Sequence, residues 1–463
     1  MSEELSKDSK PAEPPRTGSL LVIFLTVFID LLGFGMVLPL LPLYAKSFAA
    51  DPAYQWTDST TGLMIGLLMS SFSAMQFLFV PVWGALSDRW GRRPVVIIGL
   101  LGSFVFYGLF GLATIWKSYI GLLLSRLGAG IAGATIATAQ AYIADTTARE
   151  ERNRGMALIG AAFAGGFTLG PALGMAAVMA GGSMEASPWP GFVAAGLSGV
   201  ALLLAIFWLP ESLRPGSESA ARPIFDAEAL TSALAIPSMI PLLASSFLTV
   251  FSFANFETTL SLLVAGLLDH HVESPILQGL IDWIHARGFT QPDQVKLIVV
   301  LAAYGIVGII LVLSQGLLVR QLARFVSEGY LATAGAIAGC IGFVVLAMAS
   351  EHNDIAWLLV GMAIEVMGFA LVTPSLQSLI SRRADPEHQG GILGLSQSAS
   401  AMARILGPMC AQPLFVRGAA LPYSIGGWLM AVGVFSIAWA ASSGHDYLSA
   451  DGKTPEKDAP LME

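Results

Sequence analysis

Long apolar runs alternate with short polar segments along almost the whole chain, and twelve of these runs are long enough to be membrane helices. A helix needs about 20 residues to cross a hydrocarbon core of about 30 Å. The pattern therefore predicts an all-α integral membrane protein with twelve transmembrane helices. The predicted spans are residues 19–45, 61–86, 95–115, 119–144, 156–180, 191–209, 238–266, 297–319, 330–349, 355–380, 392–415 and 422–441.

A long polar connection divides these spans into two groups of six. Residues 210–237 are rich in proline, serine and charge, which is typical of a linker. The predicted organisation has a tail (1–18), an N-terminal half (19–209), this linker, a C-terminal half (238–441) and a second tail (442–463).

The two halves also resemble each other in sequence pattern. A shift of 237 residues places residues 142–160 over 379–397, and it places Gly170 and Pro171 over Gly407 and Pro408. Repeated six-helix halves are a transporter architecture, with the binding site between the halves near the membrane midplane. The sequence thus predicts two pseudo-symmetric six-helix halves around a central site.

Composition and charge agree with a membrane protein and give its orientation. Only 12% of the residues are charged and 55% are hydrophobic, whereas soluble domains carry about 25% charged residues. Of the 24 lysines and arginines, 17 lie in the tails and even-numbered connections and five on the opposite side. The positive-inside rule then places both termini in the cytoplasm. No basic surface suited to nucleic acid is present.

The connection at residues 267–296 is long and is predicted to face the outside. Its segment from Ile276 to Phe289 could form a short interfacial helix with one apolar side. Three histidines lie here, His270, His271 and His285, but no partner stands at a recognisable ligand spacing. We expect solvated loop histidines and no metal site.

A charged hairpin, GALSDRWGRRP, joins the second and third spans. Gly84 and Gly91 permit a close helix approach and a tight turn. Asp88 can pair with an arginine or lie at a helix N-terminus, where negative charge is favoured. The alternative interpretation is that Arg89 and Arg92 only fix the topology.

Five ionisable residues fall well inside predicted spans. Because a charge near the bilayer centre costs at least about 2.5–3.5 kcal/mol, such residues usually line a cavity and have a function. They are Asp30, Arg126, Glu257, Glu365 and Arg404. Glu365 is the preferred candidate for a carboxylate that alternately binds a proton and a cationic substrate, whereas Glu257 could simply face the outer vestibule. Arg404 could instead suit an anionic substrate.

Uncharged polar and small residues add further candidates. Gln140, Asn255 and Gln377 lie at plausible cavity depth, although the sequence does not say which face they occupy. In the fifth span, small residues recur once per helical turn before and after a proline, which lets this helix pack closely on a neighbour. These residues are Gly166, Gly170, Pro171 and Gly174.

Four of these stretches resemble the major facilitator superfamily, and within it the twelve-span drug:proton antiporters of the tetracycline-efflux type. GALSDRWGRRP is similar to the loop motif between spans two and three, and FIDLLGFGMVLPLLP to the motif of the first span. SRLGAGIAGA resembles the fourth-span motif, and GFTLGPALG resembles the antiporter motif of the fifth span. Two features depart from the pattern: residues 267–296 are longer than usual, and GLLVRQLAR lacks the aspartate of the hairpin motif.

The resemblance implies roles for several residues. It implies that Asp88, Arg89 and Arg92 gate the transporter, with Asp145 joining a charge relay. It implies coupling or proton transfer at Asp30 and Arg126, and a leak-resistant packing role for the fifth-span glycines. A structural hydrogen bond at Asp30, a counter-ion role for Arg126 and a solvated helix end at Asp145 remain the alternatives.

Together these features predict a secondary transporter, not an enzyme. We expect proton-coupled export of small amphiphilic compounds by alternating access, with the proton gradient as energy source and no cofactor. The expected partners are the substrate, protons and the bilayer, and the protein is expected to act as a monomer in the plasma (bacterial inner) membrane. A carrier of a metabolite or organic anion, using Arg126 and Arg404, is the main alternative. A membrane enzyme or a non-transporting receptor is less consistent with the sequence, since neither HExxH nor GxSxG is found.

Overall fold

The described part of the chain is helical, with short connections. The computed structural model describes residues 17–49, 54, 56–147, 152–181, 186–213, 231, 236–269, 274–384 and 389–443. Most of the predicted linker (210–237), both tails before residue 17 and after residue 443, and His270 and His271 lie outside the described residues.

The N-terminal half contains six spans, two of which are interrupted. Its helices are α1 (Thr17–Val37), η1 (Leu38–Leu40), α2 (Leu41–Ala49), α3 (Asp58–Trp90), α4 (Arg92–Ile115), α5 (Tyr119–Gly133), α6 (Ile136–Thr146), α7 (Arg152–Ala180) and α8 (Trp189–Trp208). The first span consists of α1, η1 and α2, and it changes helix type where Pro39 lacks the backbone donor that a regular helix needs. The fourth span consists of α5 and α6.

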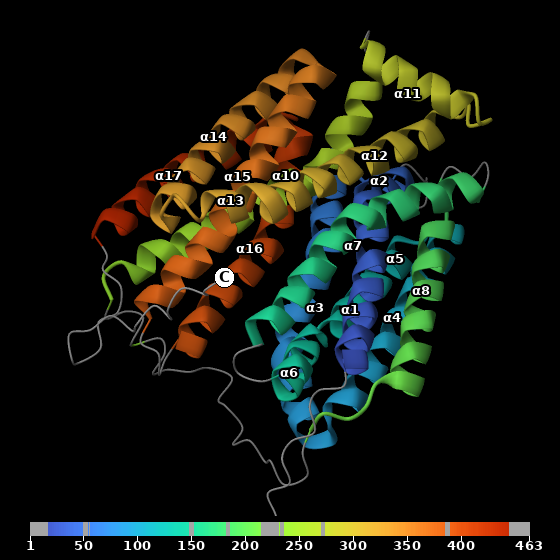
Figure 1. The fold of residues 1–463 in the computed structure, drawn as a ribbon. Coiled ribbons are helices and arrows are strands. Elements are labelled where there is room, and N and C mark those ends of the chain that lie inside the picture. The colour runs from blue at the N-terminus through green and yellow to red at the C-terminus, as the bar shows by residue number, and fades with distance from the viewer. Residues whose placement is uncertain are drawn as a thin grey trace, which may run out of the picture.

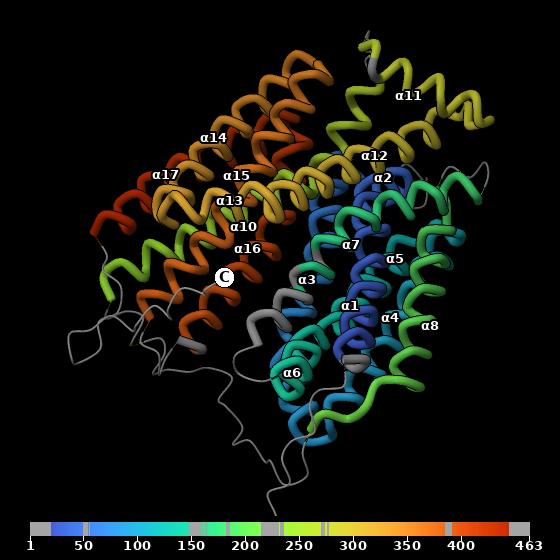
Figure 2. The backbone as a smooth tube through the Cα atoms, viewed as in Figure 1, coloured from blue at the N-terminus to red at the C-terminus, as the bar shows by residue number. Residues whose placement is uncertain are grey.

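The C-terminal half repeats this plan with one extra helix. Its helices are α10 (Met239–Asp269), α11 (Pro275–His285), α12 (Pro292–Leu313), η2 (Ser314–Val319), α13 (Arg320–Leu322), α14 (Glu328–His352), α15 (Ile355–Arg383), α16 (Gln389–Arg417) and α17 (Leu421–Ser443). The eighth span consists of α12, η2 and α13, and the backbone trace in Figure 2 follows α12 into α13 without a turn.

Length and hydropathy support the membrane assignment. Within the described residues, ten helical segments are long and apolar enough to cross a membrane. The other two spans are α7 and α16, which have 29 residues each and are rich in small residues. They pack along neighbouring spans, α7 on α1 and α12 and α16 on α3 and α10, and the twelve-span prediction is confirmed.

Helix packing follows the predicted division into halves (Figure 1). In the N-terminal half α1 packs against α7 and α8, and α4 packs against α5 and α8. In the C-terminal half α14 packs against α15 and α17, and α10 packs against α16 and α17. The two halves meet where α3 contacts α16 and where α7 contacts α12. These two contacts, span two with span eleven and span five with span eight, are equivalent under the pseudo-symmetry.

The two halves touch toward one end of the bundle, which we call the α2 end because α2 lies there. The hydroxyl of Ser70 on α3 donates to the backbone oxygen of Ile405 on α16 at 2.6 Å. A methyl group on Gly66 would approach the oxygen of Pro408 to 2.9 Å. On the other side of the interface, Gly174 of α7 lies against Leu301 of α12. The opposite end, where α3 turns into α4 at Gly91, is called the hairpin end below.

The predicted interfacial helix is present as α11 (Pro275–His285) at the α2 end (Figure 1). Leu277 and Ile284 are buried and Leu280 and Ile281 are half-buried against the core, as the apolar side of this segment predicts. Nearby, Lys296 binds Asp269 at 2.7 Å and joins the start of α12 to the end of α10. The helix is therefore part of the packed fold.

Candidate functional site

A cavity of about 310 Å³ lies between the two halves near the middle of the helices. Apolar and aromatic side chains line most of it, as in sites for amphiphilic small molecules. Four charged side chains also line it, one carboxylate and one guanidinium from each half. They are Asp30 and Arg126 from the N-terminal half and Glu257 and Arg404 from the C-terminal half.

Aromatic rings form two groups on opposite walls. On the C-terminal wall Phe253 and Phe369 stack, with ring centroids 3.9 Å apart. On the N-terminal wall Phe34 lies 4.8 Å from Phe72 and 5.7 Å from Phe167. These rings offer apolar, polarisable surfaces on both sides of the cavity.

Asp30 belongs to a polar cluster in the N-terminal half. Its carboxylate accepts a hydrogen bond from Ser103 on α4 and lies within electrostatic range of Tyr107, which in turn interacts with Arg126. One oxygen of Asp30 is buried without a hydrogen-bond partner among the described residues. Gly33 leaves room for the ring of Tyr107, which a methyl group there would approach to 3.0 Å. The first-span motif thus positions both the acid and its aromatic neighbour.

Arg126 on α5 is 1% exposed and carries three buried nitrogen atoms without a hydrogen-bond partner in the described chain. Its guanidinium lies 4.6 Å from the ring centroid of Phe72 and 5.5 Å from that of Phe34. These cation–π contacts offset part of the free-energy cost of removing the guanidinium from water. They leave the N–H donors free, and a buried charge without hydrogen bonds is costly to maintain. This side chain therefore has unused capacity for an anion or for water.

Span four is interrupted between α5 and α6, seven residues beyond Arg126. The carbonyl groups that this break frees are bound by side chains of α3: Trp83 Nε1 donates to Ile131 at 2.7 Å, and Gln76 Nε2 donates to Gly133 at 3.2 Å. Gly130 lets α5 approach α3 closely, because a methyl group there would lie 2.9 Å from Met75 Cβ. The break is thus stabilised by hydrogen bonds and close packing from span two.

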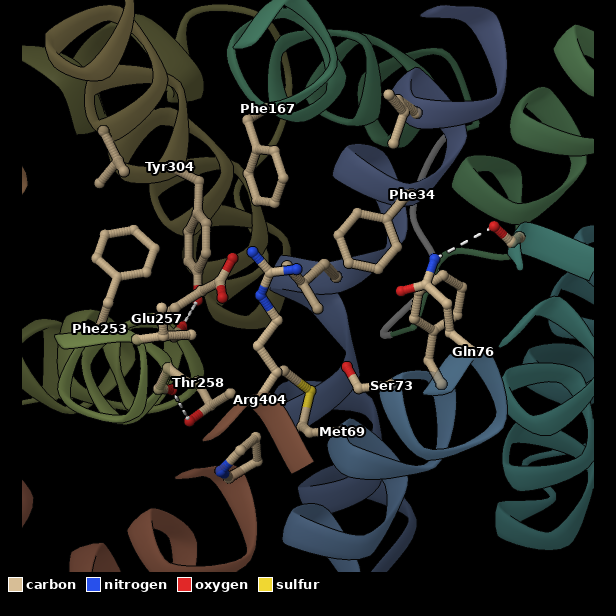
Figure 3. A pocket seen from close by; sticks show the side chains of 18 of the residues that line it. Phe34, Met69, Ser73, Gln76, Phe167, Phe253, Glu257, Thr258, Tyr304 and Arg404 are labelled. Carbon is tan, nitrogen blue, oxygen red and sulfur yellow. Dashed lines mark hydrogen bonds between the residues drawn. The ribbon is translucent and has the colours of Figure 1, made fainter. Parts of the chain in front are cut away.

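Glu257 and Arg404 form the corresponding charged group in the C-terminal half. Figure 3 shows the charged ends of the two side chains pointing toward one another, and they interact electrostatically. Tyr304 of α12 donates its hydroxyl hydrogen to the backbone oxygen of Glu257. Arg404 is accessible at the cavity surface, in contrast to the enclosed Arg126.

Glu365 does not line this cavity. It is 3% exposed and lies where α15 packs against α14, since a methyl group on Gly342 would come within 2.8 Å of its Cα. One of its oxygens has no hydrogen-bond partner in the described chain, and its charge interacts with that of Glu257. Glu257, which the sequence placed second, is therefore the C-terminal carboxylate on the cavity wall.

The three predicted polar cavity residues also lie away from the cavity lining. Asn255 is buried and donates to the backbone oxygen of Phe251 at 2.9 Å, within its own helix. Gln140 is exposed and Gln377 is half-buried, and neither lines the cavity. Of the predicted cavity candidates, Arg404 is the residue that the structure places on its wall.

The charged residues of the hairpin meet around Arg92, which is 8% exposed. Its guanidinium binds Asp88 at 2.5 Å and Asp145 of α6 at 3.1 Å, and it donates to Ser87 Oγ at 2.6 Å. Arg92 thus lies between the two acids, and the charge relay that the resemblance implies remains a prediction. Arg89 is exposed at the end of α3.

Gly91 and Glu211 complete this hairpin cluster. Gly91 has a positive φ of 101°, a conformation that favours glycine, so the predicted tight turn is confirmed. Glu211, just after α8, accepts hydrogen bonds from the backbone N–H groups of Arg92 at 2.9 Å and Arg93 at 3.1 Å. A carboxylate at the N-terminus of a helix is favourable. The close helix approach expected at Gly84 is wrong, because a methyl group there would meet nothing within 4 Å.

The C-terminal half has an equivalent ion pair with reversed polarity. Glu328 at the start of α14 binds Arg382 at the end of α15 at 2.8 Å, whereas Arg92 at the start of α4 binds Asp145 at the end of α6. GLLVRQLAR lacks the aspartate of the hairpin motif, and in this half the ion pair between Glu328 and Arg382 joins spans nine and ten.

The fifth-span glycines pack α7 onto the first span as predicted. A methyl group on Gly170 would lie 2.8 Å from Gly35 Cα, and one on Gly166 would lie 2.8 Å from Leu31 Cβ. Gly174 contacts both Met36 and Leu301, so it lies where α7 meets the other half. The proposed resistance to leak remains a prediction.

An interface cavity with ionisable groups from both halves defines the class of protein, a membrane carrier of the two-half type. Comparison with known proteins agrees. The family model described as Major Facilitator Superfamily matches residues 23–408, and the chain belongs to that superfamily. It is a transporter-family protein and not an enzyme.

Two relatives and one further structure show how far the similarity extends. The chain is 30% identical over 403 residues to the tetracycline resistance protein, class C, of Escherichia coli, covering 87% of this chain and 90% of that protein. The crystal structure of the human organic anion transporter MFSD10 (TETRAN) is 26% identical, with a TM-score of 0.61 over 92% of this chain and 100% of that one. The D-xylose–proton symporter has a TM-score of 0.70 at 15% identity, covering 94% of this chain and 99% of that one, and shows the fold alone.

Proposed function

We propose that this protein is a proton-coupled secondary transporter that exports a small amphiphilic compound by alternating access. The observation that carries the proposal is the cavity between the halves, where aromatic walls surround one carboxylate and one guanidinium from each half. An amphiphile can place its apolar body on the rings and its polar group among the charges. Glu257 and Asp30 are the carboxylates that can exchange a proton there.

The proposed orientation of the protein rests on its charges. The arginines of the hairpin cluster support a cytoplasmic position of the hairpin end. Because the halves touch toward the α2 end, the described arrangement is then the state that receives substrate from the cytoplasm. Export requires the opposite state, in which the hairpin ends of the two halves come together.

The membrane potential can supply the energy. Each elementary charge that moves across 100 mV yields about 2.3 kcal/mol, which corresponds to a concentration ratio of roughly fifty. We place the protein in the plasma (bacterial inner) membrane as a monomer, with protons, substrate and lipid as its partners and no cofactor.

An organic anion is the second candidate class of substrate. Arg126 has N–H donors without partners, and Arg404 is accessible on the opposite wall. A planar carboxylate matches the fork of donors that a guanidinium presents. The relative that is named an organic anion transporter supports this class, whereas the tetracycline resistance relative supports export of a drug-like compound.

The test is a flux assay in liposomes that contain a pH-sensitive dye, with an imposed proton gradient. Tetracycline, tetraphenylphosphonium and fluorescein represent a drug-like zwitterion, a lipophilic cation and an organic anion. We expect at least one to trigger proton movement in the wild type, and Glu257→Gln or Asp30→Asn to abolish it. Substrate flux without proton movement contradicts coupling, and no flux with any probe contradicts the proposed substrate classes.

A further inference from the structure

Span eight changes from α-helical to π-helical hydrogen bonding over residues Ser314–Val319, between α12 and α13. A π-helical turn contains more residues than an α-helical turn, is rare, and often lies at a functional site. No proline lies in this segment to explain the change. A proline therefore does not cause this change in hydrogen bonding.

The π-helical segment lies beside the cavity and places one polar side chain on its wall. Gln315 lines the cavity one turn beyond Leu311, and its side chain is accessible there. The segment packs against α15, which contributes Phe369 and Thr373 to the same cavity. Gln315 is thus close to α15, the helix that contributes Phe369 to the aromatic stack with Phe253.

The amide of Gln315 has unused hydrogen-bonding capacity. It forms no hydrogen bond with the part of the chain that the structure describes, although it carries two N–H donors and one acceptor. Gln76 is the cavity-lining amide of the opposite half. It already donates to the backbone oxygen of Gly133, next to the break in span four. Thr373 already donates its hydroxyl hydrogen to Phe369 at 2.9 Å and retains its lone pairs as acceptors. Gln315 is therefore the amide of this wall that is free to donate.

We infer that Gln315 is a specificity-determining residue that donates a hydrogen bond to a neutral oxygen acceptor, such as a carbonyl or hydroxyl, on the transported molecule. The π-helical turn places it there. A site that hydrogen-bonds a substrate oxygen discriminates against molecules that lack it, because the amide is then left unpaired. This inference rests on the proposed function, since it concerns the same cavity.

The test compares Gln315→Leu with the wild type in liposomes, using tetracycline, which carries several oxygen acceptors, and tetraphenylphosphonium, which carries none. We expect Gln315→Leu to raise KM for tetracycline about tenfold while kcat stays within twofold, as loss of a single hydrogen bond implies. KM for tetraphenylphosphonium should stay unchanged or fall. Gln315→Asn should restore part of the affinity, because it retains the amide.

Leu317→Ala is the matched control, because Leu317 lies in the same π-helical turn but is 57% exposed on the outer surface. It should leave both KM values unchanged. If both Gln315→Leu and Leu317→Ala lower kcat for both probes equally, the turn has a structural role and the inference is overturned. An unchanged KM for tetracycline in Gln315→Leu, in a preparation whose wild type transports it, also overturns it and leaves the proposed function intact. A wild type that transports neither probe overturns the inference together with the proposed function.

Discussion

The hydroxyl of Ser70 donates a hydrogen bond to the backbone oxygen of Ile405 at 2.6 Å, and these two residues belong to opposite halves of the protein. The bond lies on the α2 side of the cavity, next to the close approach of Gly66 to Pro408. An interface made of a hydroxyl, glycines and backbone atoms can separate without exposing charge. This relationship leads to the first prediction.

Enlarging Gly66 should destabilise the state described here. A valine side chain would clash with the backbone of Pro408 and with Met409 Cα, which lie 2.9 and 3.1 Å from a Cβ at this position. Gly66→Val should therefore shift the population toward the state that is open at the α2 end. Increased labelling of a Ser70→Cys background by an impermeant thiol reagent added from that side checks the prediction. Unchanged labelling would show that the halves do not separate along this contact.

Removing the guanidinium of Arg92 should destabilise the hairpin cluster. Arg92→Ala leaves Asp88 and Asp145 without their shared cation, but both carboxylates are about one-third exposed, so solvent screens part of the loss. We expect a cost of about 1–3 kcal/mol, measured as a lower unfolding temperature in detergent. Arg89→Ala is the control and should have little effect, because Arg89 is exposed. Equal effects of the two substitutions would contradict the assigned centre of the cluster.

Gly91→Ala should also be destabilising, for a backbone reason. The φ of 101° is unfavourable for alanine, and the added methyl group would press on the carboxylate of Glu211. A cost of about 1–3 kcal/mol follows from the strained conformation. Thermal unfolding of Gly91→Ala and of Gly84→Ala provides a matched pair, since Gly84 has open space around it. A larger loss at Gly84 would contradict this assignment.

Arg126→Gln should stabilise the substrate-free protein while impairing transport. The substitution removes a buried charge whose nitrogen atoms have no hydrogen-bond partner in the described chain, and relief of about 1–3 kcal/mol is expected. Transport should fall by at least tenfold, because the anion- or proton-linked role is lost. Unfolding temperature and liposome flux measured on the same preparation check both parts. A destabilised variant would show that Arg126 has a structural partner.

Substituting Glu257 should separate substrate exchange from proton coupling. In Glu257→Gln, exchange of labelled for unlabelled substrate across the liposome should continue, whereas accumulation driven by a proton gradient should stop. Glu365→Gln should retain most of the driven accumulation, because Glu365 lies outside the cavity lining. If Glu365→Gln stopped driven accumulation and Glu257→Gln retained it, Glu365 would be the coupling carboxylate, as the sequence suggested.

The sequence was sufficient for the spans, the division into halves, the helix after residue 274 and the hairpin turn at Gly91. These features depend on runs of apolar residues and on local backbone requirements, which a single sequence displays. The sequence could not show that Glu257, and not Glu365, lines the cavity. Both lie well inside a span, and depth does not say which way a helix is rotated about its axis.

Several residues of the site were missed for related reasons. Tyr107, Tyr304 and Gln76 sit in apolar runs without a local motif, and their roles depend on partners from other helices. Glu211 was counted as linker, although its position directly after the sixth span was a usable signal. The break in span four has no proline to mark it, only the glycine-rich segment near Gly130 and Gly133.

Alternating access is the central claim, and electron–electron distance measurement between spin labels tests it most directly. One pair, Ala85→Cys with Ser327→Cys, spans the two halves at the hairpin end, and the other, Asp58→Cys with Arg417→Cys, spans them at the α2 end. All four positions are exposed. When a transported probe and a change of pH are applied, the first distance should shorten while the second lengthens. Distances that stay fixed at both ends under every condition would contradict the account.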